Sequence, residues 1–401
     1  HKAVQWSYDL LEDDEKKVFK RISVFAGGFT LEAAEIVSAG DDIDSFDVVD
    51  LLDSLVSKSL VVVTRSEDNL RYRMLETIRA YGAEQLEATE DAFDVRAAHA
   101  TFFAREADAN FKVWRSKDQL QAHRWLDAEI NNLRSAFTWA MEQDQIDPAA
   151  RIASSVGDLA RFALIEEAAN WAELVVEKAL SVRHPRSVIL LTWSASSAWA
   201  ASRFEDAQRF GNQALELLQD PHYEPFVWAY GDLAFVAIFS GDVPKAIELL
   251  AEGAGHPVDA HDRMMMTFHL YIMATAGFAE DARLIADDVV RKVDAAGVPM
   301  SIAVAHAARG AALEAIDPEA ALKEYEYGIE VASTSGARFM ETLIAPRLAS
   351  LHVSAGAPQT ALEGFERMLL AYGETTDMAC VSAWRASLVI LLEKTGQFQA
   401  A

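Results

Sequence analysis

The sequence contains a single cysteine, Cys380, and no long apolar run. One cysteine excludes an intramolecular disulfide framework and any zinc site built from several thiolates. No apolar stretch approaches the roughly 20 residues that a membrane-spanning helix needs. The first residues, HKAVQWSYDL, lack the architecture of a signal peptide. We therefore expect a soluble, cytoplasmic piece of protein.

Basic residues are also scarce. The 401 residues include 36 Lys and Arg against 62 Asp and Glu, for a formal net charge of −26. A surface this negative repels phosphate groups. The charge therefore argues against direct binding to nucleic acid and against docking on an anionic membrane.

Sequence patterns of catalytic sites are absent as well. The chain has no phosphate-binding Gly-x-x-x-x-Gly-Lys-Ser/Thr loop, no Gly-x-Ser-x-Gly elbow and no His-Glu-x-x-His motif. His256, His261 and His269 lie near one another in sequence, but a metal site would need further ligands. We predict no enzymatic activity, no metal site and no cofactor within this chain.

Residues 1–95 have the pattern of three helices, a hairpin and a further helix. Ser7 and Thr30 are candidate N-caps, and the acidic run that starts at Asp13 suits the positive end of a helix. The expected helices and strands are Asp9–Phe25, Leu31–Val37, a helix from Asp44 or Ser45, strands Leu60–Thr64 and Leu70–Met74, and Glu76–Glu87. This order is that of a winged helix.

The winged helix itself is acidic. Residues 1–95 hold 10 Lys and Arg and 21 Asp and Glu, for a net charge of −11. The expected recognition helix, Ser45–Ser57, contains Asp47, Asp50 and Asp53 and no basic residue. It would face DNA phosphates with charge of the same sign. We therefore predict that this module packs against protein and does not read DNA.

Three blocks of this region carry a family resemblance. They are WSYDLLEDDEKKVFKRISVFAGGFTLEAAEIV, LLDSLVSKSLVVV and RYRMLETIRAYGAEQL, in that order over about 85 residues. Together they resemble the winged-helix region of bacterial STAND regulators, NB-ARC-type signal-transducing ATPases of the kind found in actinobacteria with LuxR-type or class III cyclase output domains. The resemblance implies an ATP- or ADP-binding core upstream, absent from this sequence, on which the winged helix closes.

The resemblance also implies a nucleotide-sensing position. In this family a Met-His-Asp-like motif at the end of the wing lets a His contact the diphosphate of bound ADP. The matching residues here are Met74, Leu75 and Glu76. Leu75 stands in place of the His, and an apolar side chain cannot donate to phosphate. Glu76 keeps the acid, which would also be favourable simply as a negative charge at a helix N-terminus.

Residues 96–160 are predicted to form a helical linker. The sequence is rich in Ala, Leu and Glu, and it contains no strand pattern. Within one of the expected helices, Ile130, Leu133, Phe137 and Ala140 share a face. The expected helices are His99–Asp108, Gln119–Leu126, Glu129–Met141 and Ala149–Phe162.

Residues 161–401 contain an internal repeat of 36 to 40 residues. A turn signal, most often Gly five residues earlier, precedes an alanine in the second helix of each unit, and small or apolar residues follow four and seven positions later. The alanines are Ala168, Ala207, Ala246, Ala282, Ala321, Ala361 and Ala401. The pattern resembles stretched tetratricopeptide (TPR) repeats. Because Ala401 begins a second helix, we expect a superhelix truncated in its last repeat, within a fragment of a larger protein.

Four tryptophans fall on predicted first helices, which line the concave face of such superhelices: Trp193, Trp199, Trp228 and Trp384. Exposed rings there would anchor a peptide or partner protein, whereas core packing is the alternative for each. The hypothesis that follows is a non-enzymatic sensor and regulatory segment of a STAND-type transcriptional regulator. Its partners would be its own nucleotide-binding core and an inducer, peptide or protein. A regulatory segment of a multidomain nucleotide cyclase and a free-standing interaction scaffold remain open.

Overall fold

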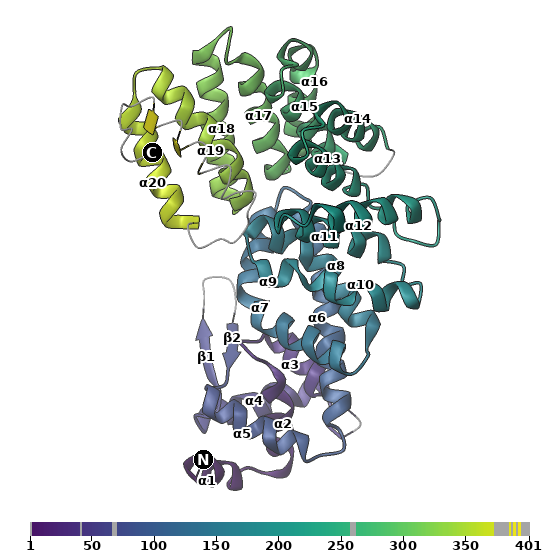
Figure 1. Cartoon of the computed structure of the whole chain (residues 1–401). Coiled ribbons are helices and arrows are strands. Elements are labelled where there is room, and N and C mark those ends of the chain that lie inside the picture. The colour runs from purple at the N-terminus through teal and green to yellow at the C-terminus, as the bar shows by residue number, and fades with distance from the viewer. Residues whose placement is uncertain are drawn as a thin grey trace. The chain divides into compact units, whose positions relative to one another are not determined.

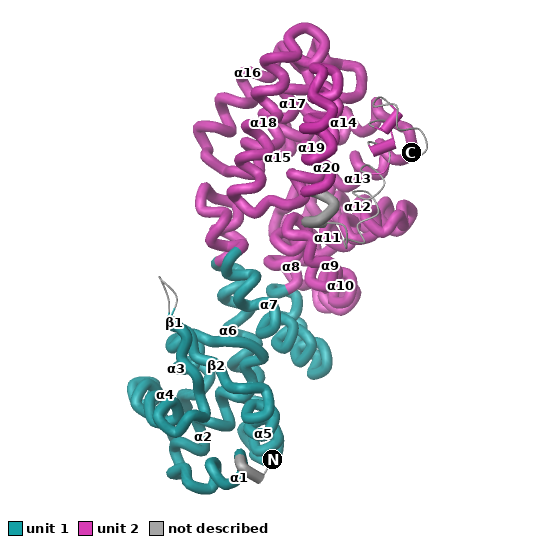
Figure 2. The backbone as a smooth tube through the Cα atoms, turned by 90° about the vertical axis from the view of Figure 1, so that its left-hand side faces the viewer, with its two compact units in different colours: residues 1–109, 124–152 teal, residues 110–123, 153–401 magenta. Residues whose placement is uncertain are grey.

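The computed structural model describes residues 2–40, 42–65, 70–256 and 262–372, together with 385, 388–389 and 392–393. The described chain is mainly helical, with one two-stranded antiparallel sheet near the N-terminus (Figure 1). It divides into two compact units, residues 1–109 with 124–152 and residues 110–123 with 153–401 (Figure 2). The division into residues 1–95, 96–160 and 161–401 made from sequence stays a prediction.

The first unit begins with a winged helix, as expected from the sequence. The strands β1 and β2 pair in antiparallel register, with Val62 opposite Arg73. The elements are α1 (Lys2–Asp9), α2 (Asp13–Arg21), the 3-10 turn η1 (Ile22–Val24), α3 (Leu31–Ser38), the 3-10 turn η2 (Ser45–Asp47), α4 (Val48–Ser57), β1 (Val62–Arg65), β2 (Leu70–Arg73) and α5 (Glu76–Glu87).

Local capping sets the start of α2 and of α3. The Thr30 hydroxyl accepts a hydrogen bond from the Ala33 amide at the start of α3, as expected. The prediction that Ser7 caps a helix is wrong, because Ser7 lies inside α1. The chain turns after α1, and α2 begins at Asp13 with a capping box between Glu12 and Glu15.

The core of the winged helix is built on aromatic rings between helices and wing. The rings of Phe25 and Phe29 stack with centroids 4.5 Å apart, and Phe29 stacks on Tyr72 at 5.9 Å. Phe29 and Tyr72 also exchange two backbone hydrogen bonds of 2.8 Å. The loop before α3 thus adds a one-residue bridge to the wing, which the sequence pattern did not reveal.

Two long helices, α6 (Ala92–Trp114) and α7 (Gln119–Glu142), follow the winged helix. The expected break between Gln119–Leu126 and Glu129–Met141 is wrong, because the chain between them has no glycine or proline and continues as helix. Within the first unit, Arg71 donates a 2.5 Å hydrogen bond to Glu129 from the wing. Asn132 bonds the backbone of Gly27 and Gly28.

The second unit is a superhelix of TPR-like helical hairpins. From α11 onward, the two helices of each hairpin pack together, and each second helix also contacts the first helix of the next hairpin. The helices are α8 (Ile146–Ala163), α9 (Glu166–Ala169), α10 (Trp171–Ser181), α11 (Ser187–Ala200), α12 (Phe204–Leu217), α13 (Ala229–Phe239), α14 (Val243–Ala254), α15 (Asp262–Thr275), α16 (Ala279–Ala296), α17 (Pro299–Leu313), α18 (Pro318–Ser335), α19 (Arg338–Ser354) and α20 (Pro358–Tyr372).

The repeat expected from the sequence is confirmed by burial. All the alanines of the series from Ala168 to Ala361 are buried, and Ala401 lies outside the described residues. The turns before them are left-handed at Gly241, Gly277 and Gly356, with φ of +83°, +100° and +82°. Glycine adopts such φ values without steric cost, which explains its place five residues before the alanine.

Small residues in the second helices permit close helix contact. A Cβ at Gly328, seven residues after Ala321, would lie 2.9 Å from the carbonyl oxygen of Ala303 on α17. Gly364 on α20, three residues after Ala361, has no described atom within 4 Å of where its Cβ would lie. No described helix is long and apolar enough to cross a membrane.

Replacing Gly328 tests this packing. We expect Gly328→Ala to destabilise the second unit by about 1–3 kcal/mol, because the new methyl meets backbone that cannot move independently. The matched variant Gly364→Ala should be neutral or stabilising by up to about 1 kcal/mol, since alanine favours helix and nothing opposes it. Urea unfolding followed by circular dichroism measures both, and equal midpoints would contradict the close-contact account.

Candidate functional site

The residues of the Met-His-Asp-like triplet lie at the junction of wing and helix. Met74 is buried, Leu75 precedes the first turn of α5 with 47% of its surface exposed, and Glu76 begins the helix. Arg79, one turn later, donates to Glu76 at 2.6 Å and lowers the pKa of that carboxyl. Leu75 therefore presents an accessible side chain that cannot donate a hydrogen bond.

A shallow groove of about 970 Å³ extends from this triplet within the first unit. It is lined by the start of α5, the start of α6 and one face of α7. Its charged lining residues are Arg79, Arg96, Arg134, Glu76, Glu87, Glu90 and Glu142. Arg79 and Arg96 are paired with Glu76 and Glu87, and carboxylates outnumber guanidinium groups. The groove by itself therefore does not favour a polyphosphate.

The face of α4 that a winged helix would turn to DNA is acidic and exposed. Asp47, Asp50 and Asp53 all face solvent, and the described residues provide none of them with an ion-pair partner. Phe46 beside them is 84% exposed. Uncompensated carboxylates at this position repel a phosphate backbone.

The first-helix tryptophans are placed in the core. Trp193, Trp199 and Trp228 are only 1%, 4% and 4% exposed, and Trp384 lies outside the described residues. The Trp193 indole donates to the Ser154 carbonyl at 3.0 Å. Because these three rings are buried, they offer no open anchor for a partner. Their burial fits core packing, the alternative considered from the sequence. Helix α11, SVILLTWSASSAWA, is buried on every side, which its lack of a polar face could have indicated.

A buried polar cluster, missed from sequence, lies among α8, α11 and α13. The Asp232 Oδ1 atom accepts from Ser196 Oγ at 2.6 Å and from Trp199 Nε1 at 2.9 Å. The Arg161 guanidinium lies 5.0 Å from the centre of a Trp199 ring. Burial raises the pKa of Asp232 to about 7, against the opposing effect of Ser196, Trp199 and Arg161, and nearby Asp158 raises it further.

Asp158 behaves in the same way. Burial raises its pKa to about 7, although the Arg115 guanidinium and the Trp114 indole act in the opposite direction. Asp158 on α8 and Asp232 on α13, both buried in the core of the second unit, therefore change charge near neutral pH. They link the stability of the second unit to proton uptake.

The sign of this linkage gives a test. A folded-state pKa of about 7, above the unfolded value near 3.8, means that the folded chain holds the proton more tightly. The contribution to stability is fully present below about pH 4 and is lost as pH rises through 7. We expect the midpoint of thermal unfolding to fall between pH 5.5 and 8 by less in Asp232→Asn than in the wild type, because asparagine has no proton to lose. Identical slopes would contradict the linkage.

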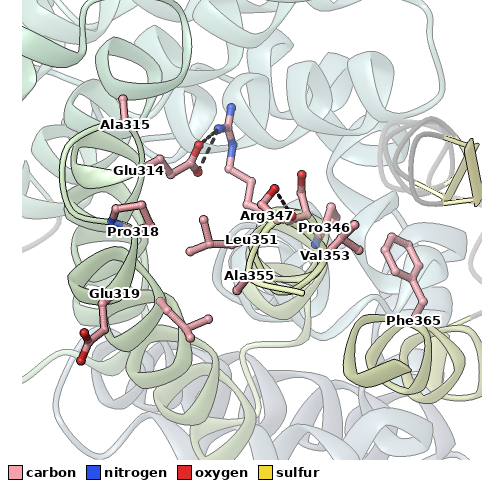
Figure 3. Close-up of a pocket in the computed structure, with 13 residues that line it drawn as sticks. Glu314, Ala315, Pro318, Glu319, Pro346, Arg347, Leu351, Val353, Ala355 and Phe365 are labelled. Atoms are coloured by element: carbon pink, nitrogen blue, oxygen red, sulfur yellow. Dashed lines mark hydrogen bonds and ion pairs between the residues drawn. The ribbon is translucent and has the colours of Figure 1, made fainter. Parts of the chain in front are cut away.

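A separate pocket of about 810 Å³ lies in the second unit among α18, α19 and α20. Figure 3 shows Glu314 and Arg347 meeting at its edge, with Nη1 to Oε1 of 3.2 Å. Tyr325 donates to Glu314 at 2.5 Å and holds that carboxylate in place. The walls are mainly apolar, from residues such as Leu351 and Phe365. An apolar cavity with one fixed ion pair suits a small amphipathic ligand.

Comparison with known proteins agrees with the winged helix. Residues 11–87 match a family model described as a winged helix-turn-helix domain. The chain is 35% identical over 212 residues to the "Putative HTH-type transcriptional regulator Rv0890c" of Mycobacterium tuberculosis, an alignment that covers 50% of this chain and 24% of that protein. It is 37% identical over 98 residues to the uncharacterized protein Rv0894 of the same organism, covering 24% and 25%.

A solved structure is also similar. The crystal structure of a signal transduction ATPase with numerous domains (STAND) that has a tetratricopeptide repeat sensor, PH0952 of Pyrococcus horikoshii, aligns with 98% of this chain and 50% of that one, at 16% identity and a TM-score of 0.36. A likeness this loose carries no conclusion about the present chain. The chain spans about a quarter of the length of the curated relatives it matches. Residues 11–87 are thus similar to a winged helix-turn-helix domain, and the curated relatives are longer proteins.

Proposed function

We propose that this chain is a non-enzymatic sensor and regulatory segment of a larger, STAND-type transcriptional regulator. The winged helix would pack on a nucleotide-binding core, and the TPR-like superhelix would bind an inducer or partner and relieve that restraint. The relative named as a transcriptional regulator supports the regulatory role. DNA contact would belong to another domain of the longer protein.

The observation that carries this proposal is the exposed acidic face of α4. A winged helix that read DNA would present basic residues there, because phosphate contacts dominate affinity. Asp47, Asp50 and Asp53 stand at those positions instead. The winged helix therefore suits an intramolecular packing role, and the repeats supply the recognition surface.

DNA binding can be tested with a charge reversal. We expect the wild-type chain not to shift a random 30-base-pair duplex at low salt, whereas Asp47→Lys/Asp50→Lys/Asp53→Lys should bind it. Each added phosphate contact contributes about 0.9 to the salt slope, so a slope near 3 is expected. Fluorescence anisotropy across a salt series measures it. The control carries the same charge change on exposed residues of the repeats, Glu177, Glu205 and Glu216.

Micromolar binding by the wild type would contradict the proposal. Equal binding by the control would show that net charge, and not the winged-helix face, determines the outcome. In either case the winged helix would have to be assigned again from its surface chemistry.

The nucleotide-sensing position gives a second test, in the longer protein that includes the upstream core. We expect Leu75→His to slow ADP release about tenfold, the effect of one charge-assisted hydrogen bond of about 1.4 kcal/mol. Leu75 is half exposed, so the substitution costs little packing. Leu75→Ala, which adds no donor, should leave ADP release unchanged. Unchanged release in Leu75→His would remove the sensing role and favour a scaffold without a nucleotide switch.

A further inference from the structure

The corner between α6 and α7, residues 110–123, belongs to the second unit. Its sequence, NFKVWRSKDQLQAH, contains three basic residues and one acidic residue in a chain of net charge −26. We call residues 110–123 the corner segment. Its side chains contact helices from several different repeats.

The first half of the corner segment packs on aromatic residues. The Arg115 guanidinium lies between two rings, 4.4 Å from the centre of Phe111 and 4.9 Å from that of Phe226, just before α13. Trp114 is fully buried, and its ring lies 6.0 Å from Phe162 at the end of α8. A cation between two aromatic faces is a favourable, specific contact.

The second half of the corner segment reaches two further repeats. The buried Gln119 side chain accepts a 2.9 Å hydrogen bond from the Met300 amide in the first turn of α17. His123 lies against Gly336 before α19, so closely that a Cβ at Gly336 would come within 1.9 Å of its ring. Arg115, Gln119 and His123 therefore bridge the amino ends of α13, α17 and α19.

These three helix ends form one rim, which we define by Phe226, Met300 and Gly336. They come from the first helices of separate hairpins. Part of the contact is imperfect, because Gln119 Nε2 is buried and has no hydrogen-bond partner among the described residues. A buried unmade hydrogen bond favours release, since water satisfies the group once it is exposed.

We propose that the rim is a recognition surface for an aromatic and basic helical corner, which the chain's own corner segment occupies as an intramolecular latch. A segment in the same chain has an effective concentration in the millimolar range, so it excludes competitors of ordinary affinity. A partner with the same chemistry binds when the latch opens. Binding of the corner segment to the rim involves neither the winged helix nor a nucleotide.

The first experiment tests whether the corner segment is held at Gly336, using the full chain. Gly336→Ala places a methyl on His123, whereas Gly356→Ala has nearly the same φ, +82° against +76°, and its new methyl meets no described atom within 4 Å. We expect hydrogen exchange at residues 110–123 to rise at least tenfold in Gly336→Ala and to stay unchanged in Gly356→Ala. The double variant Gly336→Ala/His123→Ala should regain protection. Equal exchange in the two glycine variants would overturn the latch.

The second experiment tests the rim as a recognition surface. The probe is a fluorescent peptide with the sequence of residues 108–125, and the opened protein is Arg115→Ala/Gln119→Ala, which removes two contacts to the rim and leaves every rim residue intact. We expect micromolar binding by anisotropy to this variant, and at least tenfold weaker binding to the wild type and to Gln121→Ala, an exposed position on the same segment. Equal binding to all three, or none to the opened variant, would overturn the proposal.

Discussion

The repeat array depends on helix backbones that approach one another too closely for any large side chain. Alanine and glycine occupy the contact positions of the second helices, and at Gly328 the facing atom is the backbone oxygen of Ala303. Close approach buries α11 completely and much of α17. That burial has two results for function. It removes Trp193, Trp199 and Trp228 from the surface, and it limits the open cavities of the second unit to places such as the pocket beside Arg347.

Charge organises the molecule in a different way in each unit. In the winged helix, aspartates remain exposed at the start of α4 and along it, where they would repel a phosphate backbone. In the superhelix, Asp158 and Asp232 are buried, and each has its pKa raised to about 7. Two buried acids cost stability above neutral pH, yet Asp232 also joins α11 to α13 through Ser196 and Trp199. Specific polar contacts of this kind fix which helices pack together, at some cost in stability.

Much of the fold could be predicted from the sequence, since it depends on local patterns. The structure agrees with the predicted helix Glu76–Glu87, the predicted cap at Thr30 and the predicted period of the repeats. These features were predictable because capping and small-residue spacing act within one or two helical turns. The bridge between Phe29 and Tyr72 was not predictable, because it joins residues distant in sequence. The corner segment and the Asp232 cluster were missed for the same reason. The triplet at Met74, Leu75 and Glu76 was located from a family resemblance, and its role stays a prediction.

The burial of the indoles has a spectroscopic consequence. In the second unit Trp114, Trp171, Trp193, Trp199 and Trp228 are all buried, whereas Trp6 in the winged helix is 67% exposed. Buried indoles fluoresce at shorter wavelengths than indoles in water. Ring stacking and nearby charges also alter their fluorescence quantum yield. The unlabelled chain therefore carries its own optical reporter. Loosening of the superhelix would shift the emission to the red while Trp6, Trp125 and Trp139 of the first unit contribute a background, so changes in repeat packing can be followed in real time.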